Sequence, residues 1–206
     1  MQLGLNWAIE GARLKDEGGF VKLRRTIVLV GLMGAGKSSV GKRLSEILDA
    51  PYFDSDDEIC SAAGMSVPEI FSSYGEAEFR RGENAVLKRL VSGPPAVVST
   101  GGGAFMNADN REAISQAGTS VWLDVALEVL WSRIQDKPGR PLLATENPKE
   151  TLSNLLKERE PVYKLADVAV TSTFQDSHDD VARNIIKTLQ ECDAKTPSRA
   201  VFSGEL

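Results

Sequence analysis

Eight residues near the beginning of the chain constrain its fold most strongly. Residues 31–38 read Gly-Leu-Met-Gly-Ala-Gly-Lys-Ser and complete the pattern G-x-x-x-x-G-K-[ST], directly after the apolar run 26–30. Apolar residues at helical spacing follow the motif, so it joins a predicted strand to a predicted helix. In this setting small residues let backbone N–H groups surround phosphate oxygens at a helix N-terminus. The segment therefore predicts a P-loop and a bound nucleoside triphosphate.

The positions of this loop have separate expected roles. The Lys37 ammonium should lie against the β- and γ-phosphates, and the Ser38 hydroxyl should reach a Mg²⁺ ion that also binds phosphate oxygens. A glycine-rich turn with a chance lysine would leave the flanking strand and helix unexplained. The expected nucleotide contacts within the loop are Gly34, Ala35, Gly36, Lys37, Ser38 and Ser39.

Short apolar runs alternate with longer amphipathic ones along the rest of the chain. Candidate strands lie at 26–30, 52–53, 96–99, 120–123 and 168–171, and helical patterns lie at about 37–49, 56–62, 67–73, 75–92, 107–117, 125–135, 148–163 and 178–191. Strands that alternate with helices predict an α/β fold with a mostly parallel sheet covered on both faces. Ligands of such sheets bind at the carboxyl ends of the strands.

Composition argues against several classes of partner. With 206 residues, 42% of them hydrophobic, the chain can bury one sizeable core, and a single domain is expected. The net charge of −5 argues against nucleic acid and acidic membranes, which bind positive surfaces. No apolar run reaches the ~18 residues of a membrane span, so we expect a soluble protein. Cys60 and Cys192 are typical of ordinary thiols in a reducing compartment, and His178 of a solvated helix start.

The two ends of the chain are expected to lie outside the main domain, which should span residues 26–191. Residues 1–25 have neither the apolar stretch nor the cleavage site of a signal peptide and are interpreted as an N-terminal extension. Residues 192–206 show no sustained period and are expected to be a disordered tail. The extension could form a short helix on the core through Leu3, Leu5, Trp7, Ile9 and Leu14.

Three acids follow the second predicted strand, at Asp54, Asp56 and Asp57. Such a cluster beside a P-loop can hold Mg²⁺ or accept hydrogen bonds from a substrate hydroxyl. Capping of the next helix by Asp54 or Ser55 is the simpler explanation, but a cap needs only one such residue. The cluster therefore favours a functional role.

Two further segments have a composition that suits an anionic ligand. Arg80 and Glu83 are three residues apart on a predicted helix, so the carboxylate can hold the guanidinium in place, although such pairs are usually just solvated. Gly101, Gly102 and Gly103 follow the third strand, where their entropy cost suggests close approach of backbone to ligand. They stand near the position where many P-loop proteins have a Mg²⁺-binding aspartate, which leaves Asp54 as the candidate for that role.

In this order, the motifs closely resemble those of the shikimate kinases. The resemblance covers about residues 26–190. Besides the P-loop, it rests on Asp-Ser-Asp at 54–56, Glu-Phe-Arg-Arg-Gly-Glu at 78–83, Thr-Gly-Gly-Gly at 100–103, Gly-Arg-Pro-Leu-Leu at 139–143 and Glu-Arg-Glu-Pro-Val-Tyr at 158–163. A departure is Gly82, where the family usually has a larger residue; it should loosen the helix and leave the charged positions intact.

The resemblance implies a P-loop NTPase fold with a five-stranded parallel sheet flanked by helices on both faces, an acceptor-binding region at about 55–84 and a mobile lid at about 135–148. It implies that Arg133 stacks on adenine and that Arg140 of the lid reaches the transferring phosphate. The implied shikimate-binding residues are Asp56, Arg80, Gly101, Gly102, Gly103 and Arg159.

The implied reaction transfers the γ-phosphoryl group of ATP to the 3-hydroxyl of shikimate, in a monomeric cytoplasmic enzyme of chorismate biosynthesis. Lys37, Asp56 and Arg140 would be catalytic, with Mg²⁺ held by Ser38 and Asp54. Asp56 could either orient the hydroxyl or deprotonate it. Two rival hypotheses are a related small-molecule kinase, such as a gluconate kinase, and a binding protein without catalysis. The first has no need of paired arginines, and the second would lack an essential group.

Overall fold

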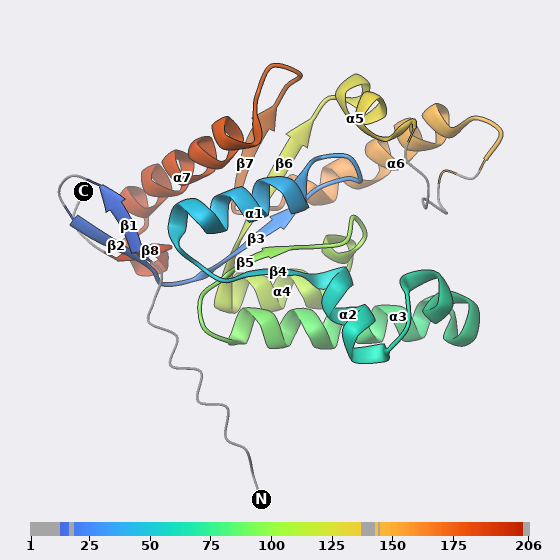
Figure 1. Cartoon of the computed structure of the whole chain (residues 1–206), viewed down its shortest axis with the longest axis horizontal. Helices are drawn as coiled ribbons and strands as arrows, with labels where there is room; N and C mark the ends of the chain where they lie inside the picture. The colour runs from blue at the N-terminus through green and yellow to red at the C-terminus, as the bar shows by residue number, and fades with distance from the viewer. Residues whose placement is uncertain (1–12, 17–18, 137–142, 144, 204–206) are drawn as a thin grey trace, which may run out of the picture.

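The computed structural model describes residues 13–16, 19–136, 143 and 145–203. Its main sheet is five-stranded and parallel, as the sequence predicts (Figure 1). The spatial order is β4 (Tyr52–Asp54), β5 (Val97–Ser99), β3 (Thr26–Val30), β6 (Gly118–Val125) and β7 (Val168–Ser172). All five residues of the central strand β3 are buried, because helices cover both faces of the sheet.

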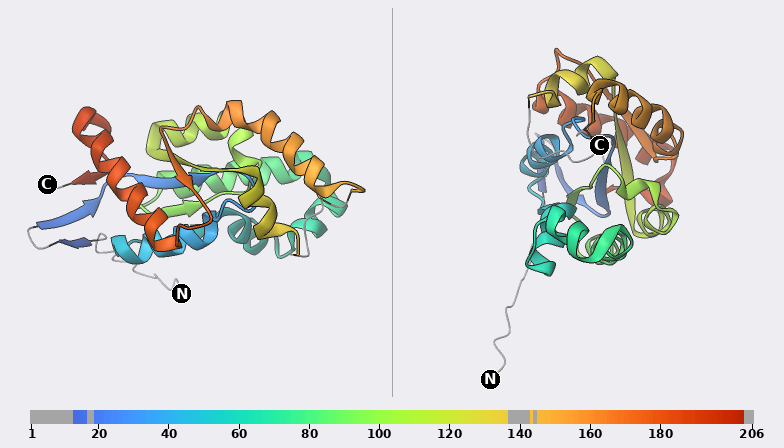
Figure 2. Two further views of the ribbon diagram at one scale, coloured as in Figure 1. Left: turned by 90° about the horizontal axis from the view of Figure 1, so that it is seen from above. Right: turned by 90° about the vertical axis from the view of Figure 1, so that its right-hand side faces the viewer.

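The helices divide between the two faces of the sheet. On one face α1 (Lys37–Leu48) packs against α7 (His178–Lys195), and on the other α3 (Val67–Ser92) packs against α4 (Ala108–Ala117), as the views of Figure 2 show. The remaining helical segments are α2 (Ser55–Ala63), α5 (Leu127–Ile134), α6 (Pro148–Tyr163) and the 3-10 turns η1 (Ala104–Met106) and η3 (Pro197–Arg199). None of the described helices is long and apolar enough to cross a membrane.

Local sequence signals explain where the helices begin. Asp54 ends β4 and also caps α2, because its side chain accepts a hydrogen bond from the Asp56 N–H. The α3 helix starts at a capping box formed by Ser66 and Glu69. It then continues through Gly75, whose φ of 79° kinks it. The sequence predicted two helices, at 67–73 and 75–92. The structure instead has one helix with a kink at the predicted break.

A second, three-stranded sheet was not predicted from the sequence. Strands β1 (Arg13–Asp16), β2 (Gly19–Leu23) and β8 (Phe202–Ser203) pair in the order β1-β2-β8, antiparallel throughout. The expected helix of the N-terminal extension is therefore wrong at Leu14, which lies in β1, and the other apolar residues named for it lie outside the described residues.

The expected disordered tail is also wrong over residues 192–203. Helix α7 continues to Lys195, and beyond it Val201 and Phe202 are buried. The Asp193 carboxylate accepts hydrogen bonds from the N–H groups of both residues. Two buried side chains and a two-residue strand are too few to produce a visible period, which is why the sequence pattern did not reveal them.

Candidate active site

A cavity of about 430 Å³ opens at the carboxyl ends of β3, β4 and β5. This is the position at which parallel α/β sheets bind their ligands. Most of the residues predicted for the nucleotide and the acceptor contribute to its lining, from separate parts of the sequence. The lining consists of Met33, Gly34, Gly36, Lys37, Ser38, Ser39, Asp54, Asp56, Thr100, Gly101, Gly102, Arg133 and His178.

The P-loop has the backbone that its glycines predict. Gly34 and Gly36 have φ of 84° and 94°, a region that favours glycine, and a Cβ at Gly34 would lie 2.7 Å from the Ile134 side chain. Lys37 opens α1, and its ammonium donates to the carbonyls of Gly31 (2.8 Å) and Leu32 (3.1 Å). The loop therefore places a buried cation at the start of a helix, where phosphate would bind.

Ser38 and Asp54 lie side by side at the cavity. The Ser38 hydroxyl donates to Asp54 Oδ2 at 2.8 Å, while Asp54 Oδ1 accepts the N–H of Asp56 at 3.1 Å. Asp54 thus caps α2 and faces the P-loop at the same time. Among the described residues no group of three or more acidic, histidine or cysteine side chains could hold a metal ion. An ion here would depend on this hydroxyl and carboxylate together with phosphate and water oxygens.

The carboxylate of Asp56 occupies an unfavourable environment for its charge. Burial raises the pKa of Asp56, and the nearby Asp54 raises it further, while Lys37 lowers it. Its Oδ1 atom is buried and has no hydrogen-bond partner among the described residues. A Cβ at Gly101 would lie 2.7 Å from this oxygen. Asp56 is therefore packed against the glycine loop through this buried oxygen, while the residue lines the cavity.

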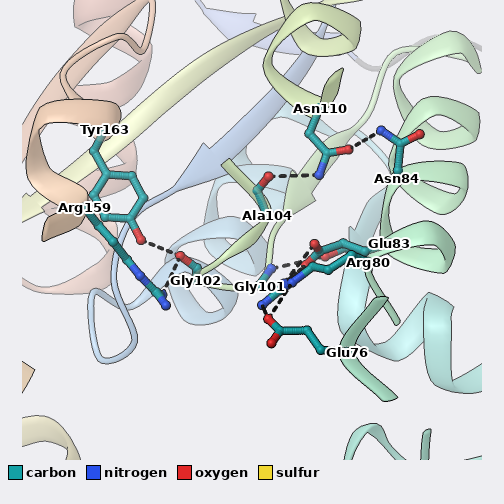
Figure 3. Close-up of polar contacts among 11 residues, drawn as sticks. Glu76, Arg80, Glu83, Asn84, Gly101, Gly102, Ala104, Asn110, Arg159 and Tyr163 are labelled. Carbon is teal, nitrogen blue, oxygen red and sulfur yellow. Dashed lines mark hydrogen bonds and ion pairs between the residues drawn. The ribbon is translucent and has the colours of Figure 1, made fainter. Parts of the chain in front are cut away.

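Arg80 is held by two acids on its own helix. Its guanidinium bonds both Glu83 oxygens (3.1 and 3.0 Å) and Glu76 Oε1 (3.3 and 3.2 Å), as Figure 3 shows. The Glu83 side chain is 1% exposed, and this burial raises its pKa although Arg80 lowers it. Because the buried Glu83 binds the Arg80 guanidinium through both oxygens, that guanidinium has a fixed position at the site.

The three glycines touch three different parts of the site. An added Cβ at Gly102 would lie 3.4 Å from the Met33 N atom of the P-loop, and one at Gly103 would lie 3.0 Å from the Arg80 guanidinium. The Gly102 carbonyl accepts hydrogen bonds from Arg159 (3.2 Å) and Tyr163 (2.5 Å), both drawn in Figure 3. The glycine loop thus brings Arg80 and Arg159 to one segment, which the order of motifs alone does not show.

Arg133 lies beside the P-loop. Its guanidinium donates to the carbonyls of Gly34 (3.4 Å) and Ala35 (3.3 Å), and also to Ser172 Oγ and the Thr173 carbonyl at 3.2 Å each. Burial lowers its pKa. These bonds join the P-loop to the loop after β7.

Some predicted features fall outside the described residues, and some residues that line the cavity were not predicted from the sequence. Arg140 and most of the expected lid lie outside the described residues. His178 is exposed at the start of α7, as predicted, but it also lines the cavity. The available signal was its place after the loop that follows β7, at the carboxyl edge of the sheet. Tyr163 contacts the glycine loop instead of lining the cavity; it belongs to the motif at 158–163, but its place at the end of an amphipathic helix resembles that of an ordinary core residue.

Comparison with known proteins agrees with this geometry. A family model described as shikimate kinase matches residues 33–190, most of the chain. The chain belongs to the shikimate kinase family. Its relatives in that family include the shikimate kinase of Ruegeria pomeroyi, 49% identical over 84% of this chain and 89% of the relative. Another is the shikimate kinase of Rhizobium leguminosarum bv. trifolii, 51% identical over 77% of this chain and 81% of the relative.

Solved structures of the family have the same fold. The shikimate kinase of Acinetobacter baumannii in complex with shikimate has a TM-score of 0.77 and 40% identity, covering 82% of this chain and 94% of that one. A gluconokinase from Sinorhizobium meliloti 1021 has a TM-score of 0.56 at 22% identity, with 84% of this chain and 97% of that one covered. The second likeness concerns the fold alone. Family membership makes this chain an ATP-dependent kinase.

Proposed function

We propose that this protein transfers the γ-phosphoryl group of ATP to the 3-hydroxyl of shikimate, giving shikimate 3-phosphate and ADP. The observation that carries the proposal is the meeting of the P-loop, Asp56 and two arginines at one glycine loop. Phosphoryl transfer needs positioning and charge neutralisation more than covalent chemistry, and these groups supply both. A relative solved in complex with shikimate supports the choice of acceptor.

The nucleotide would bind along the P-loop. Backbone N–H groups at the start of α1 and the Lys37 ammonium offer positive charge to the phosphates, and that charge is worth most as negative charge develops on the transferring group. Arg133, anchored to the P-loop carbonyls, is placed to contact the base. Arg140 is proposed to complete the phosphate site from the lid.

Ser38 and Asp54 fit a Mg²⁺ site. A hydroxyl and a carboxylate whose oxygens lie 2.8 Å apart beside the P-loop are hard oxygen ligands, and Mg²⁺ in kinases commonly takes one or two such groups with phosphates and waters. When bound, the ion would neutralise phosphate charge. The protein's own part is to hold both oxygens in place, Asp54 through its cap on α2.

The acceptor would bind between α3 and α6. Arg80 and Arg159 contact Gly103 and Gly102 respectively, so both guanidinium groups can reach a carboxylate that lies on the glycine loop. Asp56 lines the same cavity, so its carboxylate would meet the hydroxyls of the same ligand. We propose that Asp56 takes the proton of the attacking hydroxyl, because its raised pKa makes it a better proton acceptor than an ordinary aspartate.

Further parts of the proposal concern the protein in the cell. One chain supplies the P-loop, the acids and both arginines of the site, which supports a monomer as the working unit. A kinase that uses ATP is expected in the cytoplasm. The net charge of −5 supports small molecules rather than nucleic acid as partners.

The direct test is a coupled assay of ADP release with shikimate, with gluconate and with no acceptor. We expect turnover with shikimate and little with the other two. Lys37→Ala should abolish most of that turnover in a folded protein, since it removes charge that opposes the developing phosphate charge. ADP release that prefers gluconate, or that needs no acceptor, would contradict the proposal.

A further inference from the structure

Tyr163 is a buried, ionisable side chain that the proposed reaction does not use. Its residue is 0% exposed, and its ring stacks on Trp122 at 6.2 Å between centroids. Burial raises its pKa to about 12, which Arg159 opposes. The hydroxyl therefore keeps its proton at any working pH and acts as a permanent donor. That donor points out of the core to the Gly102 carbonyl, 2.5 Å away.

Tyr163 shares this carbonyl with a residue of the acceptor site. Arg159 and Tyr163 are four residues apart on α6, so they lie on the same helix face. Both donate to Gly102 O, and a carbonyl oxygen has two lone pairs, enough for the two donors. The hydroxyl holds the carbonyl whether or not the guanidinium stays there. Arg159 can therefore turn toward a ligand without leaving a partly buried acceptor unpaired.

The same bond also sets the direction of the next amide. The described chain contains no cis peptide bond, and in a trans peptide the C=O and N–H groups point in opposite directions. Because the Gly102 carbonyl points at α6, the Gly103 N–H points away from it. Gly103 lies against the Arg80 guanidinium on its other side, so this amide lies between the two acceptor arginines.

We propose that Tyr163 is a positioning residue for the acceptor. By holding the Gly102 carbonyl against α6, it orients the Gly102–Gly103 peptide toward the ligand and releases Arg159 to bind a carboxylate. This inference rests on the proposed function, and it identifies a residue that tunes acceptor binding without touching the acceptor. A Tyr163 that only filled the core would influence both substrates equally, or neither.

The test is Tyr163→Phe, which removes the hydroxyl and keeps the ring. Loss of one hydrogen bond of this kind should raise the KM and the Kd for shikimate about 3- to 10-fold, with the KM for ATP little changed. Ile185→Val, a buried change in α7 of similar expected cost in stability, should leave both KM values unchanged. Tyr163→Met also lacks the hydroxyl, fills most of the space with a flexible apolar chain, and should show the same split.

Coupling to Arg159 gives a second readout. Because both side chains act on one carbonyl, the effects of Tyr163→Phe and Arg159→Ala on shikimate affinity should not add in the double variant. Strict additivity would overturn the proposal, as would unchanged shikimate KM in both Tyr163 variants or equal changes for the two substrates. Wild-type protein that is inactive with shikimate would instead overturn the proposed function itself, and the positioning role with it.

Discussion

Asp56 combines a proposed catalytic role with a cost in stability. We expect Asp56→Asn to lower kcat by about 10²–10⁴-fold, because an amide cannot take the hydroxyl proton. The same variant should be more stable at pH 7. A raised pKa means that the protonated acid is favoured in the folded state. The contribution of Asp56 to the free energy of unfolding is therefore most favourable at low pH and is lost as the pH rises through the folded pKa. The gain in Tm should therefore disappear as the pH falls below that pKa.

Thermal melts between pH 4 and pH 8 and steady-state kinetics would test both parts. Asp57→Asn is the matched control, since Asp57 is an exposed neighbour on the same helix and should change neither kcat nor Tm appreciably. Unchanged kcat with a raised KM for shikimate would assign Asp56 to binding alone. Unchanged kcat and KM would show that Asp56 takes part in neither binding nor catalysis.

Arg80 and its neighbour Arg81 offer a matched pair at adjacent positions. Arg80 is held by the buried Glu83, whereas the Arg81 side chain is 78% exposed and pairs with Glu78. Arg80→Ala should cost about 2–3 kcal/mol of shikimate binding, the range for a charged hydrogen bond, with ATP affinity little changed. Arg81→Ala should be neutral. Titrations of shikimate and ATP by calorimetry would test this prediction. A loss of ATP affinity alone in Arg80→Ala would show that the acceptor site has been assigned to the wrong residues.

Several residues of the candidate site could be placed from sequence because parallel strands bring their carboxyl ends together. Ser38 and Asp54 were predicted to share an ion, and their oxygens lie 2.8 Å apart, although the ion itself stays a prediction. The contact of Arg159 with Gly102 depends on how α6 packs against η1, and no local pattern encodes that packing. The contact of Tyr163 with the same carbonyl could not be predicted for the same reason.

At the scale of the element, two helical glycines have different surroundings. Among the described residues, and apart from the backbone of its own helix and its chain neighbours, Gly82 of α3, the departure from the family pattern, has no atom within 4 Å of an added Cβ. Gly82→Ala should therefore stabilise the protein by about 0.5–1 kcal/mol through lower chain entropy. Gly41 of α1 is the contrast, because its added Cβ would lie 2.6 Å from Ser99 Oγ and 2.7 Å from the Tyr52 ring. Gly41→Ala should destabilise, and urea unfolding of the two variants would show opposite signs.

The existence of the main elements was predictable, while some connections between them were not. All five predicted strands of the main sheet are present, since buried parallel strands produce apolar runs and their helices produce amphipathic ones. The helical patterns at 67–73 and 75–92 were interpreted as two helices, whereas the structure has one helix, α3, with non-helical backbone angles at Gly75. Here the backbone bends and the helix resumes.

At the scale of the whole molecule, the small sheet should contribute to stability without affecting the active site. Phe202 is 8% exposed and lies in β8, at the amino edge of the main sheet and away from the cavity. Phe202→Ala should cost about 3 kcal/mol of unfolding free energy with kcat and both KM values unchanged. Phe174→Ala is the control, because that ring is 65% exposed. A kinetic effect of Phe202→Ala would show coupling between the small sheet and the site.

The architecture that sequence could not predict is the part that depends on distant pairing. The five-stranded sheet follows from repeated strand–helix units, each with its own local signal. The small sheet joins residues from both sides of that domain, and its shortest strand has two residues. Only the folded domain brings these segments together, so its prediction requires the tertiary structure first.

The pairing of β2 with β8 also has a consequence for synthesis on the ribosome. Lys22 and Ser203 are partners across 181 residues, so β2 cannot pair with its second neighbour, β8, until all residues of the main domain have been synthesised. Until then the hairpin of β1 and β2 presents an open strand edge, the kind of surface on which nascent chains associate wrongly. Messages that end before codon 202 should therefore yield a product with a complete catalytic cavity and a greater tendency to aggregate.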